Sequence, residues 1–283
     1  MSANSSDNKP LQHTSHGSDV PAKKKRSALR KPSFRRKGQP SHTFNWRMVV
    51  ALPLWVLASF IAAQLVLAVV LWILNVANVS LLNLASETVI QTILSTLVYL
   101  LAFAITFGVP YIVKQREVSL KTLGIDRLPS WSDIGLAPLG FVAYGLLTAL
   151  LLFIATTYFP GFPSSQAQDV GFQSLNGRTE MLLAFATLVV LAPIAEEVLF
   201  RGYLYGKLRK YSSILPSIVI TSLLFGAVHM QWNVGLDTFA LSVVMCCLRE
   251  VTGSVWAGVL LHMIKNGIAF YLLFVGPMVT PGL

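Results

Sequence analysis

Three groups of side chains able to do chemistry together interrupt otherwise apolar stretches of this chain. They are Glu196, Glu197 and Arg201, then Phe225 and His229, then His262 and Asn266. A carboxylate and imidazoles held together can bind a metal ion or polarise a water molecule, the carboxylate acting as general base. An amide or a neutral imidazole can donate to a developing oxyanion. These residue types suit hydrolysis of an acyl bond.

Helical spacing assigns provisional roles within the groups. Residues four apart share a helix face, so Glu197 is expected to pair with Arg201. Glu196 lies about 100° round the helix and is expected to be the freer carboxylate. The same spacing sets the Phe225 ring beside His229, and it makes His262 and Asn266 project together. Lys265 is expected to point away from that last face.

Other chemistry has less support. The sequence contains no G-x-S-x-G and no H-E-x-x-H, and Cys246 and Cys247 have no base marked in the sequence. A single membrane histidine or asparagine is more often a helix–helix hydrogen bond than a catalyst. An acidic pair with an arginine is also typical of a structural ion pair or of a proton path.

The elements that must position these groups are membrane helices. Of the 283 residues, 54% are hydrophobic and only 12% are charged, against about 25% charged in an ordinary soluble domain. A helix needs about 20 apolar residues to cross the hydrocarbon core. We expect an all-α polytopic bundle of about seven transmembrane helices, at residues 48–75, 88–113, 133–158, 181–206, 213–230, 235–249 and 253–275.

Charge predicts the orientation. Residues 1–47 hold 11 of the 22 Lys and Arg but 2 of the 12 acids, so a nucleic-acid-binding surface on the folded part is excluded. The positive-inside rule predicts a cytoplasmic N-terminus, and the loops expected on that side carry the basic residues. They are Lys114, Arg116, Lys121 and Arg127 in one loop, and Lys207, Arg209 and Lys210 in the other.

The depth of each group within its membrane span predicts that the three groups meet. At about 1.5 Å per residue, Glu196 lies roughly 20 Å from the cytoplasmic end of its span, His229 roughly 24 Å and His262 roughly 15 Å. Similar depths favour one buried site built from three helices.

With its motifs E-E-x-x-x-R, F-x-x-x-H and H-x-x-x-N in order, the sequence resembles the CAAX prenyl protease and bacteriocin-processing (CPBP, or Abi) family of intramembrane proteases. The resemblance covers about residues 130–275. It implies that Glu196 and His229 activate a water and that His262 with Asn266 stabilises the oxyanion. Glu197 and Arg201 would orient the site, beside Phe225. Whether a divalent metal such as zinc takes part is left open; if one does, its ligands are expected to be Glu196, His229 and His262.

The sequence thus predicts a CAAX-protease-like intramembrane endopeptidase, a metalloprotease or a glutamate protease, in the plasma membrane. Its partners would be the lipid bilayer and a membrane-associated protein of the prenylated CAAX or bacteriocin type. A non-proteolytic immunity or scaffold protein is the alternative, and a transporter is less favoured because no inverted repeat is visible.

Four parts are expected along the chain. They are a disordered basic tail at 1–45, the first two membrane helices and their loop at 46–130, the catalytic bundle at 131–275 and a short tail at 276–283.

Overall fold

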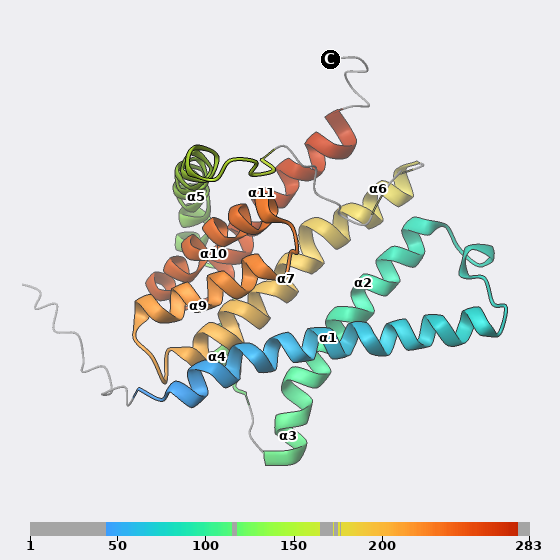
Figure 1. Ribbon diagram of the computed structural model, residues 1–283, viewed down its shortest axis with the longest axis horizontal. Coiled ribbons are helices and arrows are strands. Elements are labelled where there is room, and N and C mark those ends of the chain that lie inside the picture. The colour runs from blue at the N-terminus through green and yellow to red at the C-terminus, as the bar shows by residue number, and fades with distance from the viewer. Residues whose placement is uncertain (1–43, 115–117, 165–171, 173–174, 176, 277–283) are drawn as a thin grey trace, which may run out of the picture. The chain divides into compact units, whose positions relative to one another are not determined.

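The computed structural model describes residues 44–114, 118–164, 172, 175 and 177–276. All regular structure within these ranges is helical, which confirms the all-α prediction (Figure 1). The predicted basic tail, residues 1–45, lies almost wholly outside the described residues. It therefore stays a prediction, as does the cytoplasmic side of the N-terminus.

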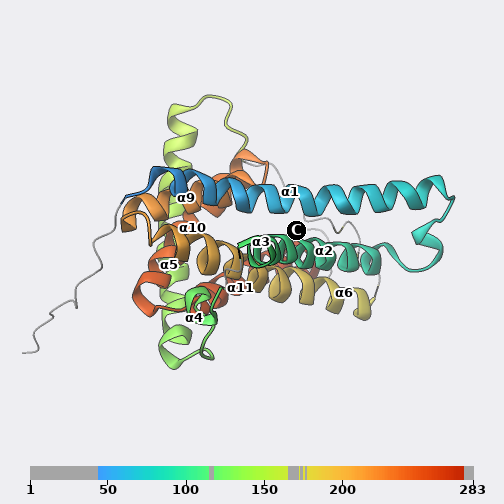
Figure 2. The same cartoon turned by 90° about the horizontal axis from the view of Figure 1, so that it is seen from below.

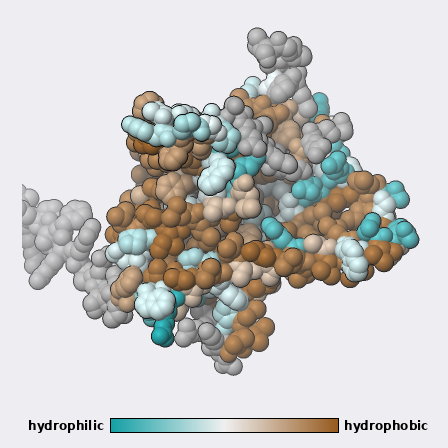
Figure 3. Space-filling model, in the orientation of Figure 1, coloured by the Kyte–Doolittle hydropathy of each residue, from teal (hydrophilic) through white to brown (hydrophobic). Residues whose placement is uncertain are grey.

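Five helical stretches are long and apolar enough to cross a membrane: Trp46–Val76, Glu87–Val113, Trp131–Tyr158, Arg178–Leu208 and Trp256–Val275. Each begins and ends within a few residues of an expected span. Their outward faces are apolar, as the space-filling view shows along α1 (Trp46–Val76) (Figure 3). Such a surface is stable against lipid and not against water. The chain is a multi-pass integral membrane protein.

The two other expected spans are also helices. Helix α9 (Ile214–Ala227) has 14 residues, and it is about 21 Å long at 1.5 Å per residue. Helix α10 (Trp232–Thr252) extends beyond its expected range at both ends and contains Asp237, Arg249 and Glu250. About seven membrane helices is therefore consistent with the structure.

Three of the spans are not uniform α-helices, a feature that apolar periodicity does not predict. The second span is divided into α2 (Glu87–Phe103), the π-helical η2 (Ala104–Gly108) and α3 (Val109–Lys114). The fourth is divided into the elements α6 (Arg178–Phe185), η3 (Ala186–Leu191), α7 (Ala192–Glu197), η4 (Val198–Tyr205) and α8 (Gly206–Leu208). The last consists of α11 (Trp256–Phe270) and the π-helical η5 (Tyr271–Val275). A π-helical turn shifts the backbone hydrogen bonds from i−4 to i−5 and frees carbonyl groups.

The helices pack as two connected groups. Helices α1 and α2 form a hairpin through the short η1 (Leu81–Asn83), and α2 also contacts α6 and η3. Helix α10 packs against α9, α11 and α5 (Trp131–Tyr158). Figure 1 shows α5 nearly end-on and Figure 2 shows it along its length, so its axis is directed crosswise to that of α1. Segment α6 to α8 runs between the two groups.

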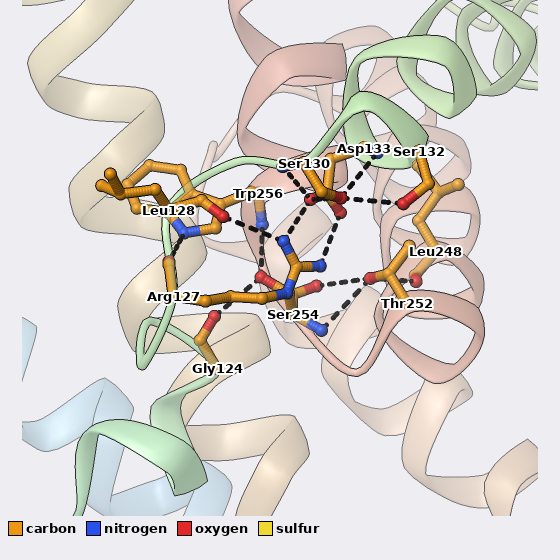
Figure 4. A network of polar contacts seen from close by, with 10 residues as sticks. All are labelled: Gly124, Arg127, Leu128, Ser130, Ser132, Asp133, Leu248, Thr252, Ser254 and Trp256. Carbon is orange, nitrogen blue, oxygen red and sulfur yellow. Dashed lines mark hydrogen bonds and ion pairs between the residues drawn. The ribbon is translucent and has the colours of Figure 1, made fainter.

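A polar network ties the start of α5 to the turn between α10 and α11 (Figure 4). Ser130 and Asp133 form a capping box, and the buried Asp133 carboxylate also pairs with Arg127. The Trp256 indole donates to the Arg127 carbonyl at 2.6 Å, and the Ser254 hydroxyl donates to the Gly124 carbonyl at 2.9 Å. These bonds fix where α11 begins, and therefore the position of the side chains along it. The loop between α3 and α5 also contains the short helix α4 (Leu120–Leu123).

This network yields the first prediction. Asp133→Ala removes an N-cap partner and a buried charged acceptor, so the free energy of unfolding should fall by about 2 to 3 kcal/mol. Unfolding of the purified protein in mixed detergent measures it. Ser132→Ala, at the exposed neighbour, is the control and should change stability by less than about 0.5 kcal/mol. Equal effects of the two substitutions would contradict the structural role given to Asp133.

Candidate active site

The three chemical groups converge on one cavity of about 250 Å³ in the apolar helical body. Its wall contains side chains from all three groups: Glu196, His229, His262 and Asn266. Glu197, Arg201 and Phe225 do not line the cavity and are buried behind it. The expectation of one site assembled from three helices agrees with this arrangement.

Glu196, near the C-terminal end of α7, presents its carboxylate to the cavity. The Tyr99 hydroxyl on α2 donates to Glu196 Oε1 at 2.6 Å. The second oxygen, Oε2, lies 3.9 Å from Nε2 of His262 on α11. With 17% of its side chain exposed, Glu196 is the more accessible of the two adjacent glutamates. One oxygen is thus held by a donor, and the other faces the imidazole.

His229 lies in the turn after α9, two residues beyond the end of the helix, and not inside a span as expected. The last four carbonyls of a helix lack partners within it. Phe225 carries one of these carbonyls, and it accepts a hydrogen bond from His229 Nδ1 at 2.8 Å. Because a carbonyl only accepts, Nδ1 carries the hydrogen, and a neutral His229 has its lone pair on Nε2. Nε2 can therefore accept a proton.

Asn266, one turn beyond His262 on α11, donates from Nδ2 to the carbonyl oxygen of Leu188 at 2.9 Å. The sequence around Leu188 explains why that carbonyl is available. In the π register of η3, the N–H of Ala192 bonds five residues back to the Thr187 carbonyl. The next N–H would serve Leu188, but the next residue is Pro193, which has none. The amide nitrogen of Asn266 keeps a second hydrogen after this bond.

Glu197 lies behind the cavity with no exposed surface, as does its partner Arg201. Arg201 Nη1 donates to Glu197 Oε1 at 2.6 Å, which confirms the pairing expected from their spacing. The same oxygen lies 3.3 Å from Nδ1 of His262. Glu197 therefore connects the arginine to the histidine whose other nitrogen faces Glu196.

Phe225 and Gly258 complete this buried layer. The Phe225 ring lies 4.2 Å from Arg201 Cζ, a cation–π contact, and packs edge-on against both His229 and His262. On α11, a Cβ added to Gly258 would lie 2.9 Å from Glu197 Oε2. Glycine is thus required for the carboxylate to approach the helix. The expected packing of Phe225 beside His229 is confirmed, and the ring contacts the arginine and both imidazoles.

One orientation expected from the sequence is wrong. Lys265 lines the same cavity as His262 and Asn266, and its Nζ lies 3.6 Å from Asp237 Oδ2. A residue three positions after His262 is only about 60° round the helix, so a long side chain reaches the same opening. Asp237 is held in turn by the Tyr144 hydroxyl on α5.

Sequence reasoning missed Tyr99, because the first three spans contain no ionisable group comparable to those of the motifs. The signal available was a tyrosine hydroxyl in the middle of an apolar span, where it needs a hydrogen-bond partner. Which partner it finds is decided by the packing of α2 against the fourth span.

The metal ligands expected from the sequence stay a prediction. In the described part of the chain, no three His, Cys, Asp or Glu side chains are grouped closely enough to form a ready-made ion site. Zinc sites in enzymes use three protein ligands. The cavity brings together one carboxylate, two imidazoles and one side-chain amide.

Comparison with known proteins agrees with the motifs. Residues 178–268 match the family model described as type II CAAX prenyl endopeptidase Rce1-like, which confirms the family expected from the sequence. The match contains every residue of the three motifs. An uncharacterised 24.3 kDa protein of Escherichia coli is 35% identical over 89 residues, covering 30% of this chain and 41% of that protein. The chain thus matches about two fifths of its relative's length. No solved structure matches.

The buried layer generates the second prediction. Removing one partner of a buried ion pair leaves the other as an unpaired buried charge. Glu197→Ala and Arg201→Ala should therefore each destabilise the protein by about 3 to 5 kcal/mol. The double variant should lose less than the sum, which a double-mutant cycle on unfolding in detergent measures.

Glu196→Ala is the matched control for this cycle. Its carboxylate bonds to Tyr99 and faces His262, so it should show little coupling to Arg201. Coupling as strong as that of Glu197 would mean that the two glutamates share the arginine.

Proposed function

Because residues 178–268 are an Rce1-like domain, we propose that this protein is an intramembrane endopeptidase that hydrolyses a peptide bond of a membrane-associated protein. The observation that carries the proposal is the arrangement of Glu196 Oε2 and His262 Nε2, 3.9 Å apart, in a cavity that His229 and Asn266 also line. The substrate class follows from the family: a prenylated CAAX-type or bacteriocin-like protein. The plasma membrane is the proposed location.

Glu196 is the general base in this proposal. A water in the cavity attacks the carbonyl carbon of the scissile bond and transfers a proton to Glu196 Oε2, while Tyr99 holds Oε1. His229, with its lone pair on Nε2, accepts a hydrogen bond from the same water and orients it. When the tetrahedral intermediate collapses, the C–N bond breaks and the proton on Glu196 passes to the leaving nitrogen. The carboxylate is then regenerated.

The oxyanion is stabilised by His262 and the second N–H of Asn266. One preorganised donor in an apolar site contributes about 3 to 4 kcal/mol to the transition state. His262 donates to the oxyanion from Nε2, and its Nδ1 lies 3.3 Å from Glu197 Oε1, a contact that orients the ring.

Glu196→Gln is the decisive variant, because glutamine keeps the volume and loses the base. Turnover should fall by at least about 100-fold with the fold intact. The assay uses an internally quenched farnesylated CAAX peptide with protein reconstituted in lipid. Glu87→Gln makes the same change at an exposed carboxylate on α2 and should keep full activity. Comparison of membrane proteomes from cells with wild-type or Glu196→Gln protein would reveal other substrates. Activity above a tenth of wild type rules out the base role.

Tyr99 is a positioning residue in this scheme. Tyr99→Phe removes the donor to Glu196 Oε1 and leaves the ring, so kcat should fall about threefold to tenfold, corresponding to about 1 kcal/mol, with KM nearly unchanged. Tyr111→Phe, at an exposed tyrosine on α3, is the control. A change in KM with constant kcat would instead place Tyr99 in substrate binding.

The donor geometry also predicts the response to chelators. Incubation with 1,10-phenanthroline should leave turnover unchanged, because the described residues present no three-ligand set. Loss of activity that added zinc restores would assign the site to a metalloprotease and would make Glu196, His229 and His262 the ligands to test.

A further inference from the structure

A second polar pocket, of about 320 Å³, shares no lining residue with the catalytic cavity. It lies where the fourth span ends at Leu208 and where α10 ends at Thr252, with α4 beside them. Its wall carries four cationic side chains and one carboxylate: Lys121, Arg209, Lys210, Arg249 and Glu250. This excess of positive charge is a property of folded helix ends, distinct from the basic block in residues 1–47.

The carboxylate in this pocket is already engaged. Glu250 Oε1 accepts hydrogen bonds from the Tyr205 hydroxyl at 2.8 Å and from Arg209 Nε at 2.6 Å. Arg249, the sequence neighbour of Glu250, instead donates from Nη2 to the Thr122 carbonyl at 3.1 Å. One carboxylate cannot neutralise four cations, so the pocket has a net positive charge.

Two backbone segments in the wall of the pocket are closely packed. A Cβ at Gly202 would lie 2.8 Å from the Leu123 carbonyl oxygen, and one at Gly206 would lie 3.0 Å from that of Thr122. The two glycines thus let α4 approach the backbone of η4 and α8. Lys121 and Lys210 in this way line the same pocket, although the two are far apart in sequence. The cations are therefore clustered by the fold and not by local repetition.

We propose that this pocket binds a phosphate group, and that an anionic phospholipid headgroup supplies it. Planar guanidinium groups and lysine ammonium groups both bind phosphate oxygens. Helix ends lie at the depth of the headgroups, where basic residues between membrane helices bind anionic lipids. The exposed Lys121 and Lys210 can reach a ligand without disturbing the Arg209–Glu250 pair. The site is independent of the proposed proteolysis.

The test compares lipid binding by the full-length protein in a neutral detergent. Native mass spectrometry should show phosphatidylglycerol bound more tightly than phosphatidylcholine. Lys121→Gln combined with Lys210→Gln should weaken phosphatidylglycerol binding about tenfold or more. Both lysines are exposed, so the unfolding midpoint without lipid should match wild type.

A charge-matched control removes two exposed arginines outside the pocket, Arg47→Gln with Arg178→Gln. It should keep the wild-type affinity. Equal weakening by both double variants, or no preference for phosphatidylglycerol in wild type, would overturn the proposal by reducing it to general charge attraction. In a second arm, displacement of the lipid from wild type by inorganic phosphate would support binding through the headgroup phosphate. Binding of inorganic phosphate without binding of phosphatidylglycerol would overturn the lipid source and assign the pocket to a soluble ligand.

Discussion

The buried carboxylate of Glu197 is the constraint on which the rest of the site depends. A buried charge is stable only with an ionic partner and hydrogen bonds. Glu197 Oε1 accepts a hydrogen bond from Arg201 and also faces His262. Arg201 in turn lies over the Phe225 ring, which packs against both histidines. One desolvated ion pair therefore fixes side chains from η4, α9 and α11 relative to one another. Gly258 leaves the space that this arrangement needs.

The irregular register of the fourth span serves the same site. A uniform helix would satisfy its own carbonyls, and Asn266 would have no backbone acceptor there. The π turn at η3 followed by Pro193 leaves the Leu188 carbonyl to the Asn266 amide. Similarly, the end of α9 leaves the Phe225 carbonyl to His229. In both cases a carbonyl without a partner in its own helix orients a polar side chain that lines the cavity. An unpaired polar group buried among apolar helices would be costly.

The two glutamates show how one dipeptide supports two functions. Adjacent positions on a helix point about 100° apart, so Glu197 is directed into the protein and Glu196 toward the cavity. The first has no exposed surface and the second is partly exposed. In the proposed mechanism the proton acceptor must meet water, whereas the carboxylate that contacts Arg201 and His262 is shielded from it. The roughly 100° between adjacent helix positions provides this separation.

Much of this arrangement was predictable from local patterns. Apolar length predicted the membrane helices, because crossing hydrocarbon requires a run of apolar residues whatever the packing. Spacing of four predicted the Glu197–Arg201 pair and the contact of Phe225 with His229, since both lie on one helical face or its continuation. The three motifs indicated the family, and the match at residues 178–268 confirms it.

Tertiary packing alone decided the remaining contacts. Tyr99 reaches Glu196, and Lys265 reaches Asp237, from one helix to another, and neither contact follows from periodicity. The π-helical η3 is in contact with both α11 and α2, which periodicity does not predict. The basic pocket arises because glycines bring α4 against α8 and gather cations from three segments. A sequence pattern determines which face of a helix a residue occupies, but only the packed helices determine which side chain lies opposite it.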